Sequence, residues 1–411
     1  MKILCVTPTY WPAYEFGGPI QSLHLLNKGL KINGVDLTVY TTNKGQSSDI
    51  IVNQLVNVDD INTTYYSYYK CLDILGTTGW HFSLPMTYEL RKNIKKFNLV
   101  YILSVWNFTS AITAYYCHKC NIPYIISPRG QLYKNVTNVK SWKKTPYFKF
   151  IVSNILKNAF AIHYTSEDEY LDVHERLKLK NKYIIKPNGI QLSDFKELPK
   201  IGEFIKKYPH LEDKDILLFL GRLSWKKGID LVIKALPKII KNNKNIHFVI
   251  AGNDEDNYKN ELLKLIKKLK LNYCDLSNSF LENNNINKAI ITFTGYLDDL
   301  NKKKAFVDSK VFILTSHSEN FGMSVVEAME CGLPVIVSKN VGISNEIIKN
   351  KAGIVVNNTF DDITESINKL IGDNELRKEV KQNSKLFVRN NFDISKISTS
   401  MSQIFNELIS K

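Results

Sequence analysis

The chain has few cysteines, and their scarcity excludes one class of protein. Six cysteines among 411 residues are too sparse for the disulfide framework of a small secreted domain. Cys117-x-x-Cys120 is the only close pair in the sequence, and no second pair joins it to complete a zinc site. We therefore expect both cysteines to be helix residues in a protein kept in a reducing cytoplasm.

The sequence also lacks a long apolar run of the kind that crosses a membrane. Met1–Thr7 is too short for a secretory signal and is cut by Pro8. Phe97–Cys117 has no charged residue, but it contains several Asn, Ser and Thr residues. A buried strand to Leu103, a loop at Trp106–Asn107 and then a helix explain this stretch better than a span does.

Length and composition indicate two α/β domains. The chain is too long for one typical domain, and 44% hydrophobic residues can fill two cores. Short apolar runs alternate with helical stretches, a pattern typical of parallel sheets. We place the domains at residues 1–190 and 200–391, followed by an amphipathic terminal helix at 392–411. The clearest strand-like runs are Asn98–Leu103, Tyr124–Ile126, Ile184–Ile185, Ile246–Ala251 and Val311–Leu314.

Residues 317–337 carry the most chemical information. Glu319 and Glu327 are eight positions apart, and Asn320–Met323 follows the first of them. The surrounding pattern predicts a strand, a loop bearing Glu319, a helix starting near Met323 and a second strand. A helix start offers backbone N–H groups and a positive dipole end, which suits a phosphate. A carboxylate one turn inside the helix can accept hydrogen bonds from sugar hydroxyls.

A second motif places two cations at a predicted strand-to-helix turn. Ile216–Leu220 has the pattern of a buried strand, and Arg222 and Lys227 follow it before Gly228. Two cations in such a turn can neutralise a pyrophosphate, with the Arg guanidinium forking onto its oxygens. Taken alone they would be ordinary surface charges, but their position between a strand and a glycine favours the binding role.

Together these strings resemble the Glu-x7-Glu signature of retaining glycosyltransferases of GT-B fold, in particular family 4, the glycosyl transferases of group 1. The resemblance implies two Rossmann-like, doubly wound domains facing across a cleft. It implies that domain 1–190 binds the acceptor, that domain 200–391 binds a nucleotide sugar, and that helix 392–411 packs back on the first domain. The expected enzyme is a retaining, hexosyltransferase-like transferase that uses a nucleoside diphosphate sugar and needs no cofactor or metal.

The resemblance also assigns roles to individual residues. Pro187–Ile190 resembles the turn that ends the family's first domain, and Phe293–Leu297 resembles the turn that lies against the nucleotide base. Glu319 would hold the donor sugar, Glu327 the ribose, and Arg222 with Lys227 the diphosphate. The expected catalytic residues are Glu319, Arg222, Lys227 and Arg129, and the expected donor-binding residues are Gly17, Gly18, Asn320, Phe321, Gly322, Met323, Ser324, Glu327, Tyr296 and Leu297.

The acceptor side departs from the family pattern. Many members have a histidine in the loop that corresponds to Ser127–Leu132, and here Arg129 stands where it is expected. An arginine cannot act as a base, but it can bind a phosphate or a sugar hydroxyl. We expect His118 and His163 to be structural, and Ser104–Asn107 to line the acceptor pocket.

One stretch of the first domain is strongly basic. The net charge of the chain is +15, and residues 118–160 contain eight Lys or Arg and no acid. Trp142 and Phe148 lie among these cations, which suits anionic lipid headgroups or an anionic acceptor such as a polyprenyl-diphosphate-linked glycan. A solvated helix is the alternative. Nucleic acid would also suit the composition, but no nucleic-acid motif accompanies it. We expect a cytoplasmic enzyme of cell-surface glycan synthesis, peripheral on the membrane.

Other interpretations remain open at this stage. Asp254–Asp256 matches a metal-binding motif of a different glycosyltransferase fold, but a solvated loop explains it better here. Within the fold, an epimerase or a phosphorylase lacks its expected sequence pattern. The alternative from another class is a non-catalytic carbohydrate- or membrane-binding protein with a degenerate site. The presence of all four charged residues, Arg222, Lys227, Glu319 and Glu327, argues against degeneration.

Overall fold

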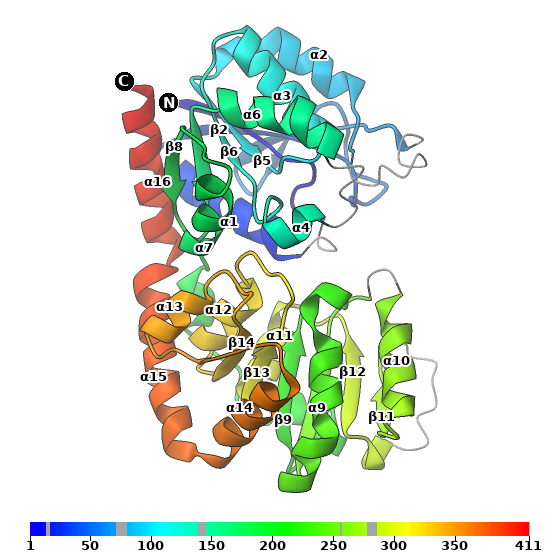
Figure 1. Cartoon of the computed structure of the whole chain (residues 1–411). Coiled ribbons are helices and arrows are strands. Elements are labelled where there is room, and N and C mark those ends of the chain that lie inside the picture. The colour runs from blue at the N-terminus through cyan, green and yellow to red at the C-terminus, as the bar shows by residue number, and fades with distance from the viewer. Residues whose placement is uncertain (14–16, 71–79, 139–144, 255–256, 278–285, 411) are drawn as a thin grey trace. The chain divides into compact units, whose positions relative to one another are not determined.

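The computed structural model describes residues 1–13, 17–70, 80–138, 145–254, 257–277 and 286–410. These residues form two compact units (Figure 1). The first consists of Met1–Ile190 together with Asp393–Lys411, and the second of Gln191–Phe392. Each unit is a sheet covered by helices, as a doubly wound α/β domain requires.

The first unit contains an eight-stranded sheet in the order β3-β4-β2-β1-β5-β6-β7-β8. Its neighbouring strands are parallel, as predicted, except that β3 and β4 form an antiparallel hairpin. Asp59 and Asp60 connect this hairpin, and both have positive φ, as a tight two-residue turn demands. The strands are β1 Lys2–Val6, β2 Asp36–Thr42, β3 Leu55–Val58, β4 Ile61–Tyr66, β5 Leu99–Leu103, β6 Tyr124–Ser127, β7 Ala161–Tyr164 and β8 Lys182–Ile185.

The apolar stretch Phe97–Cys117 forms the predicted strand, loop and helix. Strand β5 ends at Leu103, and the side chain of Asn107 caps helix α3 by accepting from Ser110 N–H at 2.9 Å. Cys117 lies in α3, whereas Cys120 is the residue just after it. Among the described residues, no helix is long and apolar enough to span a bilayer. The α-helices of this unit are α1 Gly18–Ile32, α2 Leu84–Asn93, α3 Phe108–Lys119, α4 Lys134–Asn138, α6 Ser153–Asn158, α7 Glu167–Tyr170 and α16 Ile394–Ile409.

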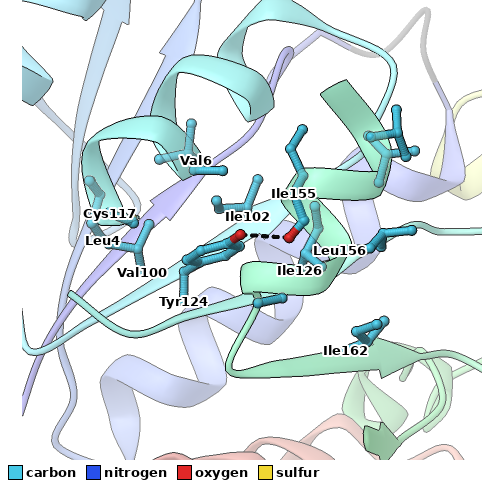
Figure 2. Packing of buried hydrophobic residues seen from close by; sticks show 14 of the residues in the cluster. Leu4, Val6, Val100, Ile102, Cys117, Tyr124, Ile126, Ile155, Leu156 and Ile162 are labelled. Carbon is cyan, nitrogen blue, oxygen red and sulfur yellow. Dashed lines mark hydrogen bonds between the residues drawn. The ribbon is translucent and has the colours of Figure 1, made fainter. Parts of the chain in front are cut away.

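The central strand β1 supplies both hydrophobic cores of the first unit. Leu4 and Val6 belong to one buried cluster, and Ile3 and Cys5 belong to the other. Because β1 is buried on both faces, its sequence is apolar without alternation. Figure 2 shows the first cluster, where the Tyr124 hydroxyl donates to the carbonyl oxygen of Ile155 at 2.6 Å.

Helix α16 completes the second of these clusters. Its residues Met401 and Phe405 are fully buried among side chains from α1, β1 and β5. The two helices α1 and α16 approach closely, since a Cβ added to Gly29 would lie 2.4 Å from Ser398 Oγ. The terminal helix is therefore part of the unit built by the first 190 residues (Figure 1).

The second unit has a seven-stranded sheet in the order β11-β12-β10-β9-β13-β14-β15, with all neighbours parallel. The central strand β9 has β10 on one side and β13 on the other, so the chain order reverses there. In open α/β sheets, ligands bind beyond the carboxyl ends of the strands at such a reversal. The strands are β9 Asp215–Leu220, β10 Ile246–Ala251, β11 Tyr273–Asp275, β12 Ile291–Gly295, β13 Val311–Leu314, β14 Val335–Ser338 and β15 Ile354–Val356.

Eight α-helices accompany this sheet in the described residues. The predicted helix near Met323 begins at that residue, and the strand predicted at Val311–Leu314 is β13. The helices are α8 Glu203–Lys207, α9 Ile229–Asn242, α10 Tyr258–Lys268, α11 Asp299–Asp308, α12 Met323–Glu330, α13 Ser344–Lys349, α14 Phe360–Gly372 and α15 Asn374–Asn391.

Each unit buries a histidine whose pKa is strongly lowered, and this makes stability depend on pH. The pKa of His163 is lowered to about 3, mainly by burial and to a smaller extent by the charge of Arg129. The pKa of His247 is lowered to about 3, mainly by burial and to a smaller extent by the charge of His210. The unfolded chain takes up these protons near pH 6.5 and the folded chain does not. Stability is therefore lost as the pH falls from 6.5 towards 3.

Replacing His247 by Gln should flatten this dependence. One such group contributes a slope of about 1.4 kcal/mol per pH unit, so about 2 kcal/mol is lost between pH 6.5 and 5. We expect His247→Gln to be less stable than wild type at pH 7, because the hydrogen bond to Thr292 Oγ1 at 2.7 Å is altered. Between pH 7 and 5 the variant should lose less of its free energy of unfolding than wild type does. Urea unfolding at pH 7, 6 and 5 measures both effects, with exposed His118→Gln as the control. Equal acid sensitivity in wild type and His247→Gln would refute the account.

Candidate functional site

Two loops at the carboxyl ends of β9 and β13 are fixed against each other. Gly228 ends the first loop with φ at +66°, and a Cβ there would lie 2.0 Å from the carbonyl oxygen of Thr315. The hydroxyl of Thr315 donates to the carbonyl oxygen of Gly228 at 2.8 Å. Only glycine fits this position, because both the backbone angle and the neighbouring carbonyl exclude a side chain. The turn bearing the two cations is thus held at the end of β13.

This contact brings Lys227 beside Glu319, and the two form an ion pair. The His317 N–H donates to the carbonyl oxygen of Lys226 at 2.7 Å and fixes the register of the two loops. Lys227 and Glu319 side chains are 20% and 18% exposed, so a ligand can still reach them. Each charge has its partner, yet neither is sealed from solvent.

The protonation state of Glu319 follows from its neighbours. Burial alone would raise its pKa, but the charge and hydrogen bond of Lys227 oppose this, as do the Phe321 N–H and the charge of Arg222. The net result is a pKa below the ordinary value, and the carboxylate is ionised at neutral pH. Arg222 therefore acts electrostatically on Glu319 together with Lys227.

Helix α12 starts where the Glu319 loop ends. Gly322 caps it in the left-handed region with φ at +85°, so Met323 and Ser324 are its first residues. Phe321 is buried and packs edge-on against Phe392 at 5.4 Å between ring centroids, which anchors the loop beneath the helix start. The two loops thus gather, in the second unit, eight of the predicted site residues: Arg222, Lys227, Glu319, Asn320, Phe321, Gly322, Met323 and Ser324.

Glu327 has a partner that the sequence did not reveal. Its carboxylate is buried and accepts from Lys302 Nζ of α11 at 3.0 Å, and Lys302 also pairs with Asp299 at 3.2 Å. Burial alone would lower the pKa of Lys302, but Glu327 and Asp299 raise it above its usual range. Lys302 was missed because it lies in a polar helix where a solvated charge is the ordinary interpretation.

Tyr296 and Leu297 lie at the same edge of this sheet, after β12. Gly295 precedes them with φ at +71°, and its carbonyl oxygen accepts from Gly252 N–H at 2.8 Å. Tyr296 is 56% exposed, whereas Leu297 is buried. Because β10 separates β12 from β9, this pair belongs to a neighbouring part of the edge rather than to the ion-pair cluster.

In the first unit, Arg129 connects segments that are distant in sequence. It has positive φ (+52°) just after β6, and its guanidinium donates to Asn188 Oδ1. Longer contacts reach Tyr101 Oη at 3.4 Å and Ser22 Oγ, on α1, at 3.5 Å. Helix α1 begins after Gly17, which has φ at +69°, with Gly18 as its first residue. Arg129 is thus tied to the helix that the glycine pair starts.

Beneath Arg129 lies a buried polar network that the sequence did not predict. Tyr101 Oη and His163 Nδ1 are 2.7 Å apart, and the other ring nitrogen of His163 is 2.9 Å from the carbonyl oxygen of Lys186. Glu169 is fully buried and accepts from the N–H groups of Gly130 and Thr165. Burial raises the pKa of Glu169 above its usual range. These groups fix the loop that carries Arg129, and His163 is structural, as expected.

Ser104–Asn107 follows β5 at the same edge of this sheet, and Gln131 holds it. The Gln131 Oε1 atom accepts from Ser104 Oγ at 2.7 Å and from Val105 N–H at 2.9 Å. The Trp106 indole donates to the carbonyl oxygen of Gln131 at 2.9 Å. Gln131 was not singled out from the sequence, where it is one polar residue in a loop.

Two predicted features lie wholly or partly outside the described residues. Of Asp254–Asp256, only Asp254 is described, and its carboxylate accepts from Lys259 N–H at 3.0 Å. In the part of the chain that the structure describes, no group of three His, Cys, Asp or Glu residues could hold a metal ion. Within the basic stretch 118–160, the residues Lys140, Trp142, Lys143 and Lys144 lie outside the described residues.

The second unit is similar to a known family of proteins. Residues 200–387 match the model of the family described as glycosyl transferases group 1. Two uncharacterized glycosyltransferases of Methanocaldococcus jannaschii are similar: one is 32% identical over 53% of this chain and 51% of its own length, and the other 24% identical over the whole of both. A capsular polysaccharide biosynthesis glycosyltransferase of Staphylococcus aureus is 25% identical over 54% of this chain and 53% of its own length.

Solved structures resemble the chain over its whole length. Sucrose-phosphate synthase from Thermosynechococcus elongatus gives a TM-score of 0.73 at 16% identity, covering 100% of this chain and 99% of that one. The Anabaena protein HepE in complex with UDP-glucose gives 0.73 at 17% identity, covering 99% and 100%. At these identities the likeness shows the fold alone, and it confirms the predicted GT-B fold of two Rossmann-like domains. The family match lies within the second unit, and the relative that is similar over the whole chain is itself named a glycosyltransferase.

Proposed function

We propose that the chain is a retaining glycosyltransferase that moves a sugar from a nucleoside diphosphate sugar to a glycan. The observation that carries this proposal is the Lys227–Glu319 ion pair, with Arg222 near it and the start of α12 beside it. Two cations and a helix start suit a diphosphate, and a partly exposed carboxylate suits sugar hydroxyls. The similarity to a protein solved with UDP-glucose makes UDP-glucose the first donor to test.

In the proposed mechanism the second unit stabilises the leaving diphosphate. In this scheme Arg222 and Lys227 are fixed positive charges next to the diphosphate, on which negative charge builds up as its bond to the anomeric carbon of the sugar breaks. Backbone N–H groups at the start of α12 add further donors. The acceptor hydroxyl attacks from the face that the diphosphate leaves, and the departing phosphate oxygen takes its proton. The sugar therefore keeps its anomeric configuration.

The ion pair itself sets a condition on donor binding. Without donor, Lys227 donates to Glu319, so an incoming diphosphate competes with Glu319 for that ammonium group. Glu319 then becomes available to accept from a hydroxyl of the donor sugar. A nucleotide without its sugar would displace Glu319 from Lys227 and offer the carboxylate no hydroxyl in exchange. Affinity would thus favour the complete nucleotide sugar over the bare nucleotide.

We further propose roles for the remaining predicted residues. Glu327 keeps one oxygen on Lys302 and offers the other to the ribose, and Tyr296 with Leu297 faces the base. In the first unit, Gly17 and Gly18 keep the phosphate-binding role that the resemblance implies, and Arg129 binds an acceptor phosphate or hydroxyl. No metal or other cofactor takes part in this scheme.

The acceptor we propose is a lipid-linked glycan of cell-surface polysaccharide synthesis. The similarity to the Staphylococcus aureus capsular enzyme supports a polysaccharide. In the described part of the basic stretch, Phe150 is 68% exposed and Lys149 Nζ lies 6.0 Å from its ring centroid. An exposed aromatic ring beside a cation suits the headgroup region of an anionic membrane. The alternative, a non-catalytic binding protein, would bind a nucleotide sugar without breaking it down or transferring it.

Variants of the ion pair separate the two roles of its members. Lys227→Ala should weaken UDP binding about tenfold to a hundredfold, since a charge-assisted contact contributes roughly 1.5–3 kcal/mol. Glu319→Gln frees Lys227 and should tighten UDP up to about fivefold, matching an ion pair of at most about 1 kcal/mol. The same variant should lose the extra affinity that the sugar confers. Calorimetric titration with UDP and with the nucleotide sugar measures these three changes in affinity, and the exposed-residue variant Lys226→Ala is the control. If both ion-pair variants kept wild-type affinities, the site assignment would be wrong.

Product chemistry tests the reaction class. Because the leaving group and the acceptor share one face of the sugar, the product should keep the donor's anomeric configuration. Because cations of the chain replace a metal ion, EDTA should leave the rate unchanged. Proton NMR of fresh product reads the anomeric centre, after a thermal-shift screen of UDP- and GDP-sugars has selected the donor. An inverted product, or activity lost to EDTA and restored by Mn²⁺, would contradict this mechanism.

Vesicle binding tests the membrane proposal. Each Lys or Arg near an anionic surface contributes about 1 kcal/mol, so a few in contact are enough. We expect co-sedimentation with anionic but not neutral vesicles, falling with salt. Binding should drop when Lys140, Lys143, Lys144 and Lys149 become Glu. The control variant makes the same charge change at four exposed lysines of the second unit, Lys241, Lys244, Lys267 and Lys268. An equal drop in both variants would indicate net charge alone.

A further inference from the structure

A half-exposed tryptophan lies within the loop that carries the two cations. Trp225 is 50% exposed and opens the short 3-10 helix Trp225–Lys227, between Arg222 and Lys227. The part of an apolar ring that stays in water contributes no hydrophobic free energy to folding. Single exposed apolar residues are nevertheless common on protein surfaces. Exposure alone therefore decides nothing, and the surroundings of the ring must carry the argument.

The ring of Trp225 is paired with His317 across the same two loops that form the ion pair. Trp225 precedes Lys227 by two positions, and His317 precedes Glu319 by two. The two ring centroids are 6.0 Å apart with 33° between the planes. The hydrogen bond from His317 N–H to the carbonyl oxygen of Lys226 holds both backbones in register. The aromatic pair thus joins the same two loops as the ion pair does, two positions before Lys227 on one loop and two before Glu319 on the other.

A second exposed aromatic residue of this unit shows what an ordinary surface ring looks like. Phe360 is 43% exposed at the start of α14, and the ammonium group of Lys238 lies 5.9 Å from its ring centroid. Its neighbour Asp361 pairs with Lys238 at 2.9 Å, but these two residues lie on helices α14 and α9 rather than on loops at the carboxyl edge of the sheet. Trp225 differs because a cation that suits a diphosphate lies two positions along its own loop, and a carboxylate that suits sugar hydroxyls lies two positions beyond His317 on the facing loop.

We propose that Trp225, backed by His317, stacks on the sugar ring of the donor beside the Lys227–Glu319 pair. A pyranose ring presents C–H groups on one face and hydroxyls around its rim. The electron-rich face of an indole suits those C–H groups, while Glu319 accepts from a hydroxyl at the rim. This inference rests on the proposed function, because it takes its sugar from the donor assigned to that site. It adds a specificity-determining surface that reads the sugar rather than the nucleotide.

The test measures, in matched variants, how much more tightly the nucleotide sugar binds than the nucleotide alone. The probes are UDP-glucose and UDP, or GDP-mannose and GDP if the thermal-shift screen selects guanosine. Trp225→Ala should leave the nucleotide affinity within about twofold of wild type. It should weaken the nucleotide sugar about threefold to tenfold, the range expected for one aromatic stacking contact. Trp225→Phe should retain most of the affinity, His317→Ala should lose part of it, and Phe360→Ala is the exposed-ring control.

Fluorescence gives a readout that a general loss of structure would not produce. The difference in emission between wild type and Trp225→Phe isolates the indole of Trp225, and the nucleotide sugar should change it while the bare nucleotide does not. Equal sugar-dependent affinity in wild type and Trp225→Ala, with no sugar-dependent emission change, would overturn the proposal. A wild-type protein that binds neither nucleotide nor nucleotide sugar would instead overturn the proposed function.

Discussion

The second unit depends on one close backbone contact, that of Gly228 with the carbonyl of Thr315. A side chain at residue 228 would collide with that oxygen, so the turn after β9 can rest on the end of β13 only because glycine is there. The contact places Lys227 against Glu319, which is 92 positions away in sequence. It also aligns Trp225 with His317. The ion pair assigned to the diphosphate and the sugar, and the aromatic pair beside it, are thus positioned by this one approach of two loops.

Much of the fold could be predicted from sequence, because its signals are local. Ile246–Ala251 reads as a buried strand and is β10, and the glycine at 322 fixes the start of α12. The meeting of Lys227 with Glu319 was also predictable in outline. Both follow central strands of a parallel sheet, and the carboxyl ends of neighbouring parallel strands share one edge. Here local pattern and topology rule agree, so the sequence predicts the residues and their proximity.

Other features could not be predicted, because they depend on contacts without a sequence period. Lys302 reaches Glu327 from a different helix, and nothing in its own helix distinguishes it from a solvated lysine. The β3–β4 hairpin turns at Asp59–Asp60, where no glycine marks the positive φ angles. Arg129 was singled out, but its bond to Asn188 and its reach to α1 follow from how the first unit packs. Partners chosen by tertiary packing become visible only in three dimensions.

The path of the chain through the two units affects the order in which they can form. The first 190 residues build the first unit except for α16, whose Met401 and Phe405 complete one of its buried clusters, and the whole second unit is synthesised in between. The part of α1 that α16 covers, around Gly29, is thus exposed on the nascent chain for roughly half of its synthesis. Such surface invites association with other chains during that interval. The second unit is continuous in sequence and can close its own core before α16 is made, so the first unit begins earlier along the chain but is completed later.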